Sequence, residues 1–193
     1  MEQLFSLLAE GFDLPILDWI AQHLYCGFLD TVMPIITVLG DAGLFWIAVA
    51  VALLFFPNYR KVGLSMGAAM VLGVLVCNVT MKPLLGRIRP YDYQLEHFGK
   101  TIQLLIATPH DFSFPSGHTL ASFEAATVLL IHNKKMGIPA MILAVLIAFS
   151  RMYLYVHYPT DVLFSVFMGI GFAFLGTWLV KKGFAAWENR KTK

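Results

Sequence analysis

Charged side chains are scarce in this sequence. Only 13% of its 193 residues are Asp, Glu, Lys or Arg, whereas 58% are hydrophobic, and the mean hydropathy is +0.70. Soluble domains carry about 25% charged residues, so this composition excludes an ordinary soluble protein and predicts an integral membrane protein. The net charge of +2 is too small to indicate a nucleic-acid partner. With only two cysteines, Cys26 and Cys77, we expect neither a disulfide framework nor a cysteine-based metal site.

No Lys or Arg occurs in the sequence before Arg60. We therefore expect no cleaved signal peptide, because such peptides begin with a basic region. Residues 1–40 are amphipathic and are interrupted by Pro15 and Pro34. This pattern predicts one or two helices lying at the membrane surface. The alternative is a spanning helix that ends near Leu39, which would bury polar side chains in lipid at a high cost. Those side chains are Asp18, His23 and Asp30.

Apolar runs dominate the rest of the chain and predict an all-α, polytopic membrane helical bundle. We expect one domain over residues 1–193, with surface helices in 1–40, the transmembrane bundle in 41–181 and a basic cytoplasmic tail in 182–193. A sixth span, formed by the N-terminal segment, is the alternative to five. The five predicted spans are residues 41–56, 62–81, 116–131, 137–155 and 159–180.

Positive charge is unequally divided between the two ends of the predicted spans. The turn at Arg60, the turn at Lys134 and the segment from Lys181 onward fall at one end and hold nine Lys or Arg residues. The opposite end holds five. Because loops rich in Lys and Arg stay in the cytoplasm, we expect residues 82–115, a long polar loop, to face outside.

A turn at residues 114–119 opens the third predicted span. Pro115 disfavours a helix before it, Ser116 is a good N-cap and Gly117 permits close approach of another group. A helix that starts here would present free N–H groups and a positive dipole end to an anion. His118 adds an acid or base within the first turn. An ordinary capped helix with a chance histidine is the alternative.

Three cations are expected near this turn, because they fall at the same end of the predicted spans. Lys82, Arg89 and Arg151 would suit a phosphoryl group, whose oxygens gain charge in the transition state. The alternative for each is a side chain that extends to the membrane surface. Arg151 fits that alternative poorly, because it lies within an apolar run, where a charge needs a partner.

His157 and Asp161 fit a nucleophile and the carboxylate that orients it, since Asp161 falls four residues after the histidine. The alternative is a surface histidine and an acid that stabilises a helix dipole. Residues alone leave open whether His118 or His157 attacks. Compact metal-ligand spacing is missing from the polar loop, so we expect no metal. Glu124, an acid within the third span, is expected to bond to a neighbouring helix or to serve function.

Three motifs in this sequence resemble the signature motifs of the type 2 phosphatidic acid phosphatase superfamily. They occur in the family's order and at its spacing, and together they cover residues 82–161. The first is Lys82 followed after six residues by Arg89-Pro90, the second is Pro115-Ser116-Gly117-His118, and the third is Ser150-Arg151 followed by His157 and Asp161.

The resemblance implies a role for each motif residue. His157 would be the nucleophile that forms a phosphohistidine, Asp161 would orient it, and His118 would protonate the leaving oxygen and then activate water. The family needs no metal and no other cofactor, and its bacterial membrane members typically have six spans. The phosphate would be held by Lys82, Arg89, Ser116, the Gly117 backbone and Arg151.

A phosphatase of the plasma membrane is therefore the expected function, with its site facing outside and a lipid phosphate or diphosphate as its substrate. Undecaprenyl diphosphate ranks first by the resemblance, and phosphatidate or phosphatidylglycerophosphate second. A lipid phosphotransferase and a non-catalytic lipid-binding protein are the alternatives. Aromatic side chains are expected to line the path of the lipid chain: Tyr91, Tyr93, Phe112, Phe114, Tyr153, Tyr155 and Tyr158.

Overall fold

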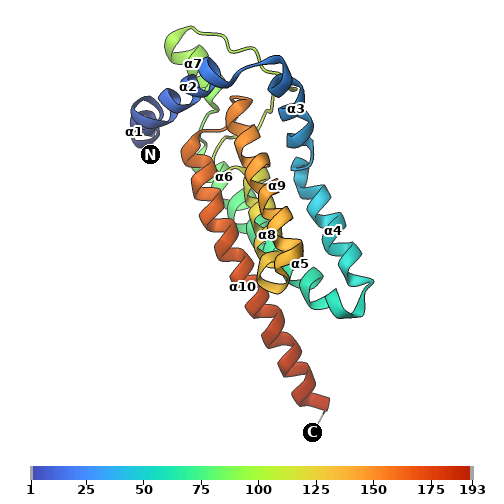
Figure 1. Cartoon of the computed structure of the whole chain (residues 1–193). Helices are drawn as coiled ribbons and strands as arrows, with labels where there is room; N and C mark the ends of the chain where they lie inside the picture. The colour runs from blue at the N-terminus through green and yellow to red at the C-terminus, as the bar shows by residue number, and fades with distance from the viewer. Residues whose placement is uncertain (1, 192–193) are drawn as a thin grey trace.

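Helix α8 (Gly117–His132) is the central helix of the bundle in this computed structural model, which describes residues 2–191 (Figure 1). It packs against α5 (Arg60–Gly73), α9 (Lys134–Tyr153) and α10 (Pro159–Lys191). Residues 2–191 contain helices and no strand. Nearly every residue of α8 from Thr119 to Leu129 is buried, as expected for a helix surrounded on all sides. The predicted all-α bundle is confirmed.

The other elements of the bundle come before and after α5 in the chain. Helix α3 continues into α4 through a short 3₁₀ turn, η2, and a second such turn, η3, joins α4 to α5. Helix α5 continues through a π-helical segment, η4, into α6. The bounds are α3 (Gly27–Val38), η2 (Asp41–Gly43), α4 (Leu44–Leu54), η3 (Pro57–Tyr59), η4 (Val74–Met81) and α6 (Lys82–Leu85).

Three helical stretches of the described residues are long and apolar enough to cross a membrane: Pro57–Phe98, Lys134–Tyr153 and Pro159–Arg190. Helices α3 and α4 make a fourth when they are counted as one span with a 40° bend. Helix α4 has only 11 residues, so it is too short to cross alone and the predicted span at 41–56 needs α3. Helix α8 has 16 residues and is shorter than α9 and α10.

Both basic turns and the C-terminal part of α10 lie at one end of the bundle, as the charge pattern predicted (Figure 1). Lys61, next to the turn between α4 and α5, sits 4.8 Å from the centre of the Phe184 ring on α10. The opposite end carries α7 (Pro90–Phe98) and the start of α8 (Figure 1). The predicted long loop over residues 82–115 is therefore partly helical, because α6 and α7 lie within it.

The N-terminal helices lie across the end of the bundle that carries α7 (Figure 1). Acidic side chains of these helices accept hydrogen bonds from tyrosine hydroxyls elsewhere in the chain. The Tyr93 hydroxyl donates to Glu10 over 2.7 Å, and that of Tyr155 donates to Asp18 over 2.8 Å. These elements are α1 (Glu2–Leu8), η1 (Ala9–Asp13) and α2 (Leu14–Leu24).

Glu124 does not make the hydrogen bond to a neighbouring helix that the sequence suggested. Its side chain is buried, and its Oε1 has no hydrogen-bond partner among the described residues. Instead the carboxyl group packs onto Gly73 of α5, where a Cβ would overlap it. Glycine at this position lets α5 and α8 approach each other around a polar group.

We expect Gly73→Ala to lower the free energy of unfolding by about 1–3 kcal/mol, because the added methyl group would overlap Glu124 Oε1 and displace this buried carboxyl group. Gly67→Ala is the matched control on the same helix, since nothing lies within 4 Å of a Cβ there. Thermal unfolding in detergent measures both. Equal stability of the two variants would contradict this account of the contact between α5 and α8.

Candidate active site

His157 lies in a tight corner between α9 and α10 and is only 1% exposed. The backbone N–H groups of Val156 and His157 both donate to the carbonyl of Arg151 over 3.2 Å. Tyr155 has a φ of +58°, a conformation uncommon for residues other than glycine. Its hydroxyl accepts a bond from Gln94 and donates to Asp18, so its side chain is held at both sides. The corner fixes the backbone from which the His157 ring projects.

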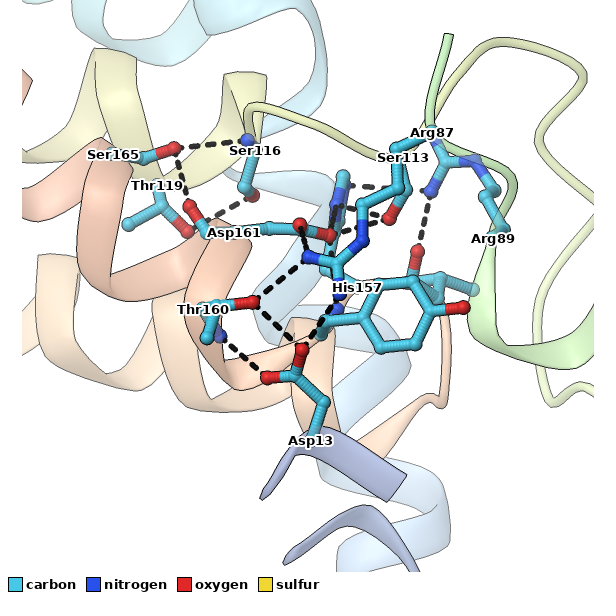
Figure 2. Close-up of polar contacts among 12 residues, drawn as sticks. Asp13, Arg87, Arg89, Ser113, Ser116, Thr119, His157, Thr160, Asp161 and Ser165 are labelled. Carbon is cyan, nitrogen blue, oxygen red and sulfur yellow. Dashed lines mark hydrogen bonds and ion pairs between the residues drawn. The ribbon is translucent and has the colours of Figure 1, made fainter. Parts of the chain in front are cut away.

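One imidazole nitrogen of His157 faces Asp161, and the other faces the guanidinium group of Arg89 (Figure 2). Nδ1 lies 3.5 Å from Asp161 Oδ2, and Nε2 lies 3.4 Å from a guanidinium nitrogen of Arg89. Asp161 accepts hydrogen bonds from Ser113 Oγ at 2.5 Å and from the Tyr158 N–H at 3.0 Å. A carboxylate beside Nδ1 favours the tautomer with its proton there, which leaves Nε2 unprotonated.

The three predicted cations converge on the same place, but two of them share an acid that the sequence did not single out. Arg89 donates to the Asp111 backbone carbonyl at 2.7 Å and to its carboxylate at 2.5 Å, and Lys82 also pairs with that carboxylate. Arg151 donates to Thr37 Oγ1 at 2.6 Å, and its Nε has no partner among the described residues. Thr37 is thus the partner that a charge within α9 requires.

His118 lies near the cations and pairs with an acid of η2. Its Nε2 is 2.7 Å from Asp41 Oδ1. Asp41 is therefore positioned to orient the His118 ring through Nε2, as Asp161 is positioned beside Nδ1 of His157. A Cβ at Gly40 would lie 2.7 Å from a carbon of this ring, so the chain leaves room for the imidazole only because glycine precedes Asp41.

Ser116 does not cap α8 as predicted. It occupies the N-cap position, but it makes no side-chain cap bond and its hydroxyl pairs with Thr119 Oγ1 at 3.0 Å. Its backbone N–H donates to Ser165 Oγ at 2.9 Å (Figure 2). Ser116 is fully buried, and Gly117 and His118 line the neighbouring cavity instead. The start of α8 is thus tied to α10, and Ser116 has no free N–H for an anion.

A cavity of about 1150 Å³ joins the polar group to the apolar part of the bundle. His118, Arg151 and His157 lie at its polar part, and aliphatic residues of α4 and α5, such as Val51 and Val71, line the rest. The prediction of an aromatic lining was wrong, because no Phe, Tyr or Trp is among the described lining residues. All five predicted tyrosines are buried instead, and the hydroxyls of four of them donate hydrogen bonds to acids or to a backbone carbonyl.

Electrostatics keep His157 neutral and Asp111 charged. Burial lowers the pKa of His157 well below its ordinary value, and the cations Arg89, Arg151 and Lys82 lower it further. Burial alone would raise the pKa of Asp111, but its bonds to Lys82 and its proximity to Arg89 lower this pKa to about 2. A neutral imidazole next to fixed cations can attack an anionic group that those cations bind.

A family model described as the PAP2 superfamily matches residues 59–185. The chain belongs to the PAP2 superfamily. It is 35% identical over 139 residues to an undecaprenyl-diphosphatase of Sulfolobus acidocaldarius, a match that covers 72% of this chain and 65% of that protein. It is 32% identical over 151 residues to undecaprenyl-diphosphatase BcrC of Bacillus subtilis, with coverages of 76% and 72%.

A solved PAP2 structure also resembles this fold. The crystal structure of a transmembrane PAP2-type phosphatidylglycerolphosphate phosphatase from Bacillus subtilis superimposes with a TM-score of 0.67 at 27% identity. The superposition covers 93% of this chain and 94% of that one. Together with the apolar helices, this likeness identifies the chain as an integral membrane protein of the PAP2 superfamily.

The structure of this PAP2 protein also brings residues to the site that the sequence analysis missed. Asp41, Asp111 and Thr37 contact the predicted histidine and cations directly, and Arg87 and Asp13 contact Asp161 directly or through each other. Arg87 carried a signal, because it is a charged residue between the two cations of the first motif. Asp13 and Asp41 carried none, since their partners lie 74 and 77 residues away in the chain.

Proposed function

We propose that this protein is a membrane lipid phosphatase that hydrolyses a lipid phosphate or diphosphate through a phosphohistidine on His157. The observation that carries the proposal is the continuity of one cavity. Its polar part holds the unprotonated nitrogen of a neutral histidine among Lys82, Arg89 and Arg151, and the remainder is mainly aliphatic, with Glu124 and Asn78 also in the lining. A phosphate head group and an apolar chain match these two parts.

Attack on phosphorus begins the proposed reaction. His157 Nε2 forms a bond to the terminal phosphorus while the bond to the leaving oxygen breaks. The guanidinium and ammonium groups stabilise the charge on the phosphoryl oxygens, and the Gly117 backbone lies beside them. His118 gives its proton to the leaving oxygen, and Asp41 holds the ring in place during this transfer.

Hydrolysis of the phosphohistidine completes the cycle. His118, now neutral, takes a proton from water, whose oxygen attacks phosphorus as the P–N bond to His157 breaks. Phosphate leaves, and both histidines return to their starting state. Asp111 pairs with the same cations that would hold phosphate, so the incoming head group replaces its carboxylate or shares those cations with it.

The lipid chain would lie along α4 and α5. Each buried CH₂ group contributes about 0.8 kcal/mol, so a long chain supplies much of the binding free energy. Because the charge pattern places the basic turns in the cytoplasm, the site would face outside. Undecaprenyl diphosphate ranks first, because two of the relatives are undecaprenyl-diphosphatases. Phosphatidylglycerophosphate ranks second, because the related crystal structure is that of a phosphatidylglycerolphosphate phosphatase.

A substrate panel in one detergent tests this proposal. We expect kcat/KM for undecaprenyl diphosphate to exceed that for phosphatidylglycerophosphate and phosphatidate, and all three to exceed that for glucose 6-phosphate. A preference for a glycerolipid would reverse only the ranking. Equal or faster turnover of the sugar phosphate would contradict the lipid phosphatase. Phosphorylated lipid appearing without free phosphate would indicate a phosphotransferase.

A further inference from the structure

Arg87 lies between two buried carboxylates, those of Asp161 and Asp13 (Figure 2). One of its terminal nitrogens donates to Asp161 Oδ1 at 2.5 Å and to Thr160 Oγ1 at 2.8 Å, and the other donates to Asp13 Oδ2 at 2.7 Å. The guanidinium also stacks 3.8 Å from the centre of the Tyr158 ring. Its side chain is 3% exposed, so these contacts replace water almost completely.

Asp13, the last residue of η1, is the second carboxylate that Arg87 contacts. Its carboxylate accepts bonds from the Thr160 N–H at 2.9 Å, from Thr160 Oγ1 at 2.7 Å and from Arg87. Its side chain is fully buried. Both Asp13 and Asp161 only accept hydrogen bonds, which is the pattern of ionised carboxylates. One arginine thus joins two anions, which fixes the distance between η1 and the first turn of α10.

The contacts of His157 itself are long by comparison. Its ring nitrogens lie 3.4 Å from Ser113, 3.5 Å from Asp161 and 3.4 Å from Arg89. The orientation of the ring therefore depends on groups that are themselves held firmly. Asp161 is such a group, because Ser113, the Tyr158 N–H and Arg87 all donate to it.

We propose that Arg87 and Asp13 are positioning residues for the nucleophile, which hold Asp161 so that His157 Nε2 points at the phosphate. The inference rests on the proposed function, because it concerns the histidine that attacks. Neither residue lines the cavity, so neither is expected to bind substrate. Asp13 also lies outside the residues 59–185 that match the family model. The N-terminal segment would then be part of the catalytic apparatus as well as a surface anchor.

Asp13→Asn removes one charge from the arrangement with little change in shape. We expect kcat to fall by about 10- to 100-fold, because a small misplacement of a reacting group has an effect of this order. KM for the lipid phosphate should stay within about twofold, because the cavity is untouched. Asp18→Asn is the matched control. Asp18 also joins an N-terminal helix to the His157 corner, through Tyr155, but it makes no contact with Arg87 or Asp161.

The pH profile separates positioning from a general loss of structure. His157 is faced by Asp161 of α10, Arg151 of α9, Lys82 of α6, His118 of α8, and Arg89 just before α7. Removing the Asp13 charge leaves Arg87 less neutralised, so the cationic imidazolium becomes less favourable and the pKa of His157 falls. The acid limb of kcat/KM should move to lower pH in Asp13→Asn and stay unchanged in Asp18→Asn.

The experiment compares the wild type, His157→Ala, Asp13→Asn and Asp18→Asn, with vanadate binding and thermal unfolding measured for each. A lower kcat and a shifted acid limb in Asp13→Asn alone, with vanadate still bound, would support the inference. Wild-type kcat in Asp13→Asn, or equal losses in Asp18→Asn, would overturn it. If Asp13→Asn fails to fold, Thr160→Val decides by kcat alone, because it removes a hydroxyl that contacts both residues but removes no charge. A lower kcat with unchanged KM and vanadate still bound would support the inference, and wild-type kcat would overturn it. An inactive wild type would instead contradict the proposed function.

Discussion

In His157→Ala we expect turnover of lipid phosphates to fall by roughly 10⁴-fold or more, the size of effect that follows loss of a nucleophile. The ring nitrogen Nε2, which lies 3.4 Å from a guanidinium nitrogen of Arg89, is the proposed nucleophile, and the methyl group of alanine cannot attack phosphorus in its place. Because burial and the cations lower the pKa of His157, its neutral form persists below pH 6.5. For wild type, the contribution of His157 to activity should therefore remain as the pH falls below 6.5 and be lost only below its lowered pKa.

His132→Ala is the control for this prediction. His132 ends α8 at the far end of the bundle, where its ring contacts only the Val128 carbonyl among the bonds described. We expect near wild-type turnover in this variant. Near wild-type turnover in His157→Ala would remove His157 from the role of nucleophile and leave His118 as the alternative that the sequence left open.

In His118→Ala we expect kcat to fall by about 10²- to 10⁴-fold with a lipid alkoxide or phosphate leaving group, the usual contribution of a general acid and base. The phosphorylation step should fall much less with p-nitrophenyl phosphate, whose leaving group departs without a proton. The comparison is made with single-turnover kinetics, because we propose that His118 also activates water in the second step.

Asp41→Asn refines this test, since it keeps His118 but removes the carboxylate at 2.7 Å from its Nε2. A smaller loss than in His118→Ala, with the same dependence on the leaving group, is the expected result. An equal loss with both leaving groups in His118→Ala would indicate that His118 binds phosphate and does not transfer the proton.

The sequence predicted which residues gather at the site better than it predicted their surroundings. The fold class follows from apolar composition, and the three motifs placed Lys82, Arg89, His118, Arg151 and His157 around one cavity, as the structure shows. These residues could be found because each motif falls at a helix end, where local rules apply. The sequence also predicted that the two basic turns lie at the same end of the bundle, because Lys and Arg residues flank the apolar runs there.

Contacts between distant segments could not be predicted. Ser116 looked like an N-cap, yet its N–H and hydroxyl bond to Ser165 and Thr119, because the start of α8 is buried against α10. The tyrosines looked like a membrane-surface lining, yet acids of η1, α2 and α3 accept hydrogen bonds from several of their hydroxyls. Both predictions were wrong because hydrogen-bond partners of these residues, such as Ser165, lie in distant segments, which the local sequence does not indicate.

Chemical quenching during turnover of a diphosphate labelled at its terminal phosphorus tests the central claim most directly. Mass spectrometry of the quenched protein should find an acid-labile, base-stable phosphate on His157, at high occupancy when hydrolysis is slowed, and none in His157→Ala. Phosphate on His118, or steady-state turnover with no phosphorylated histidine in rapid-quench samples, would contradict the mechanism.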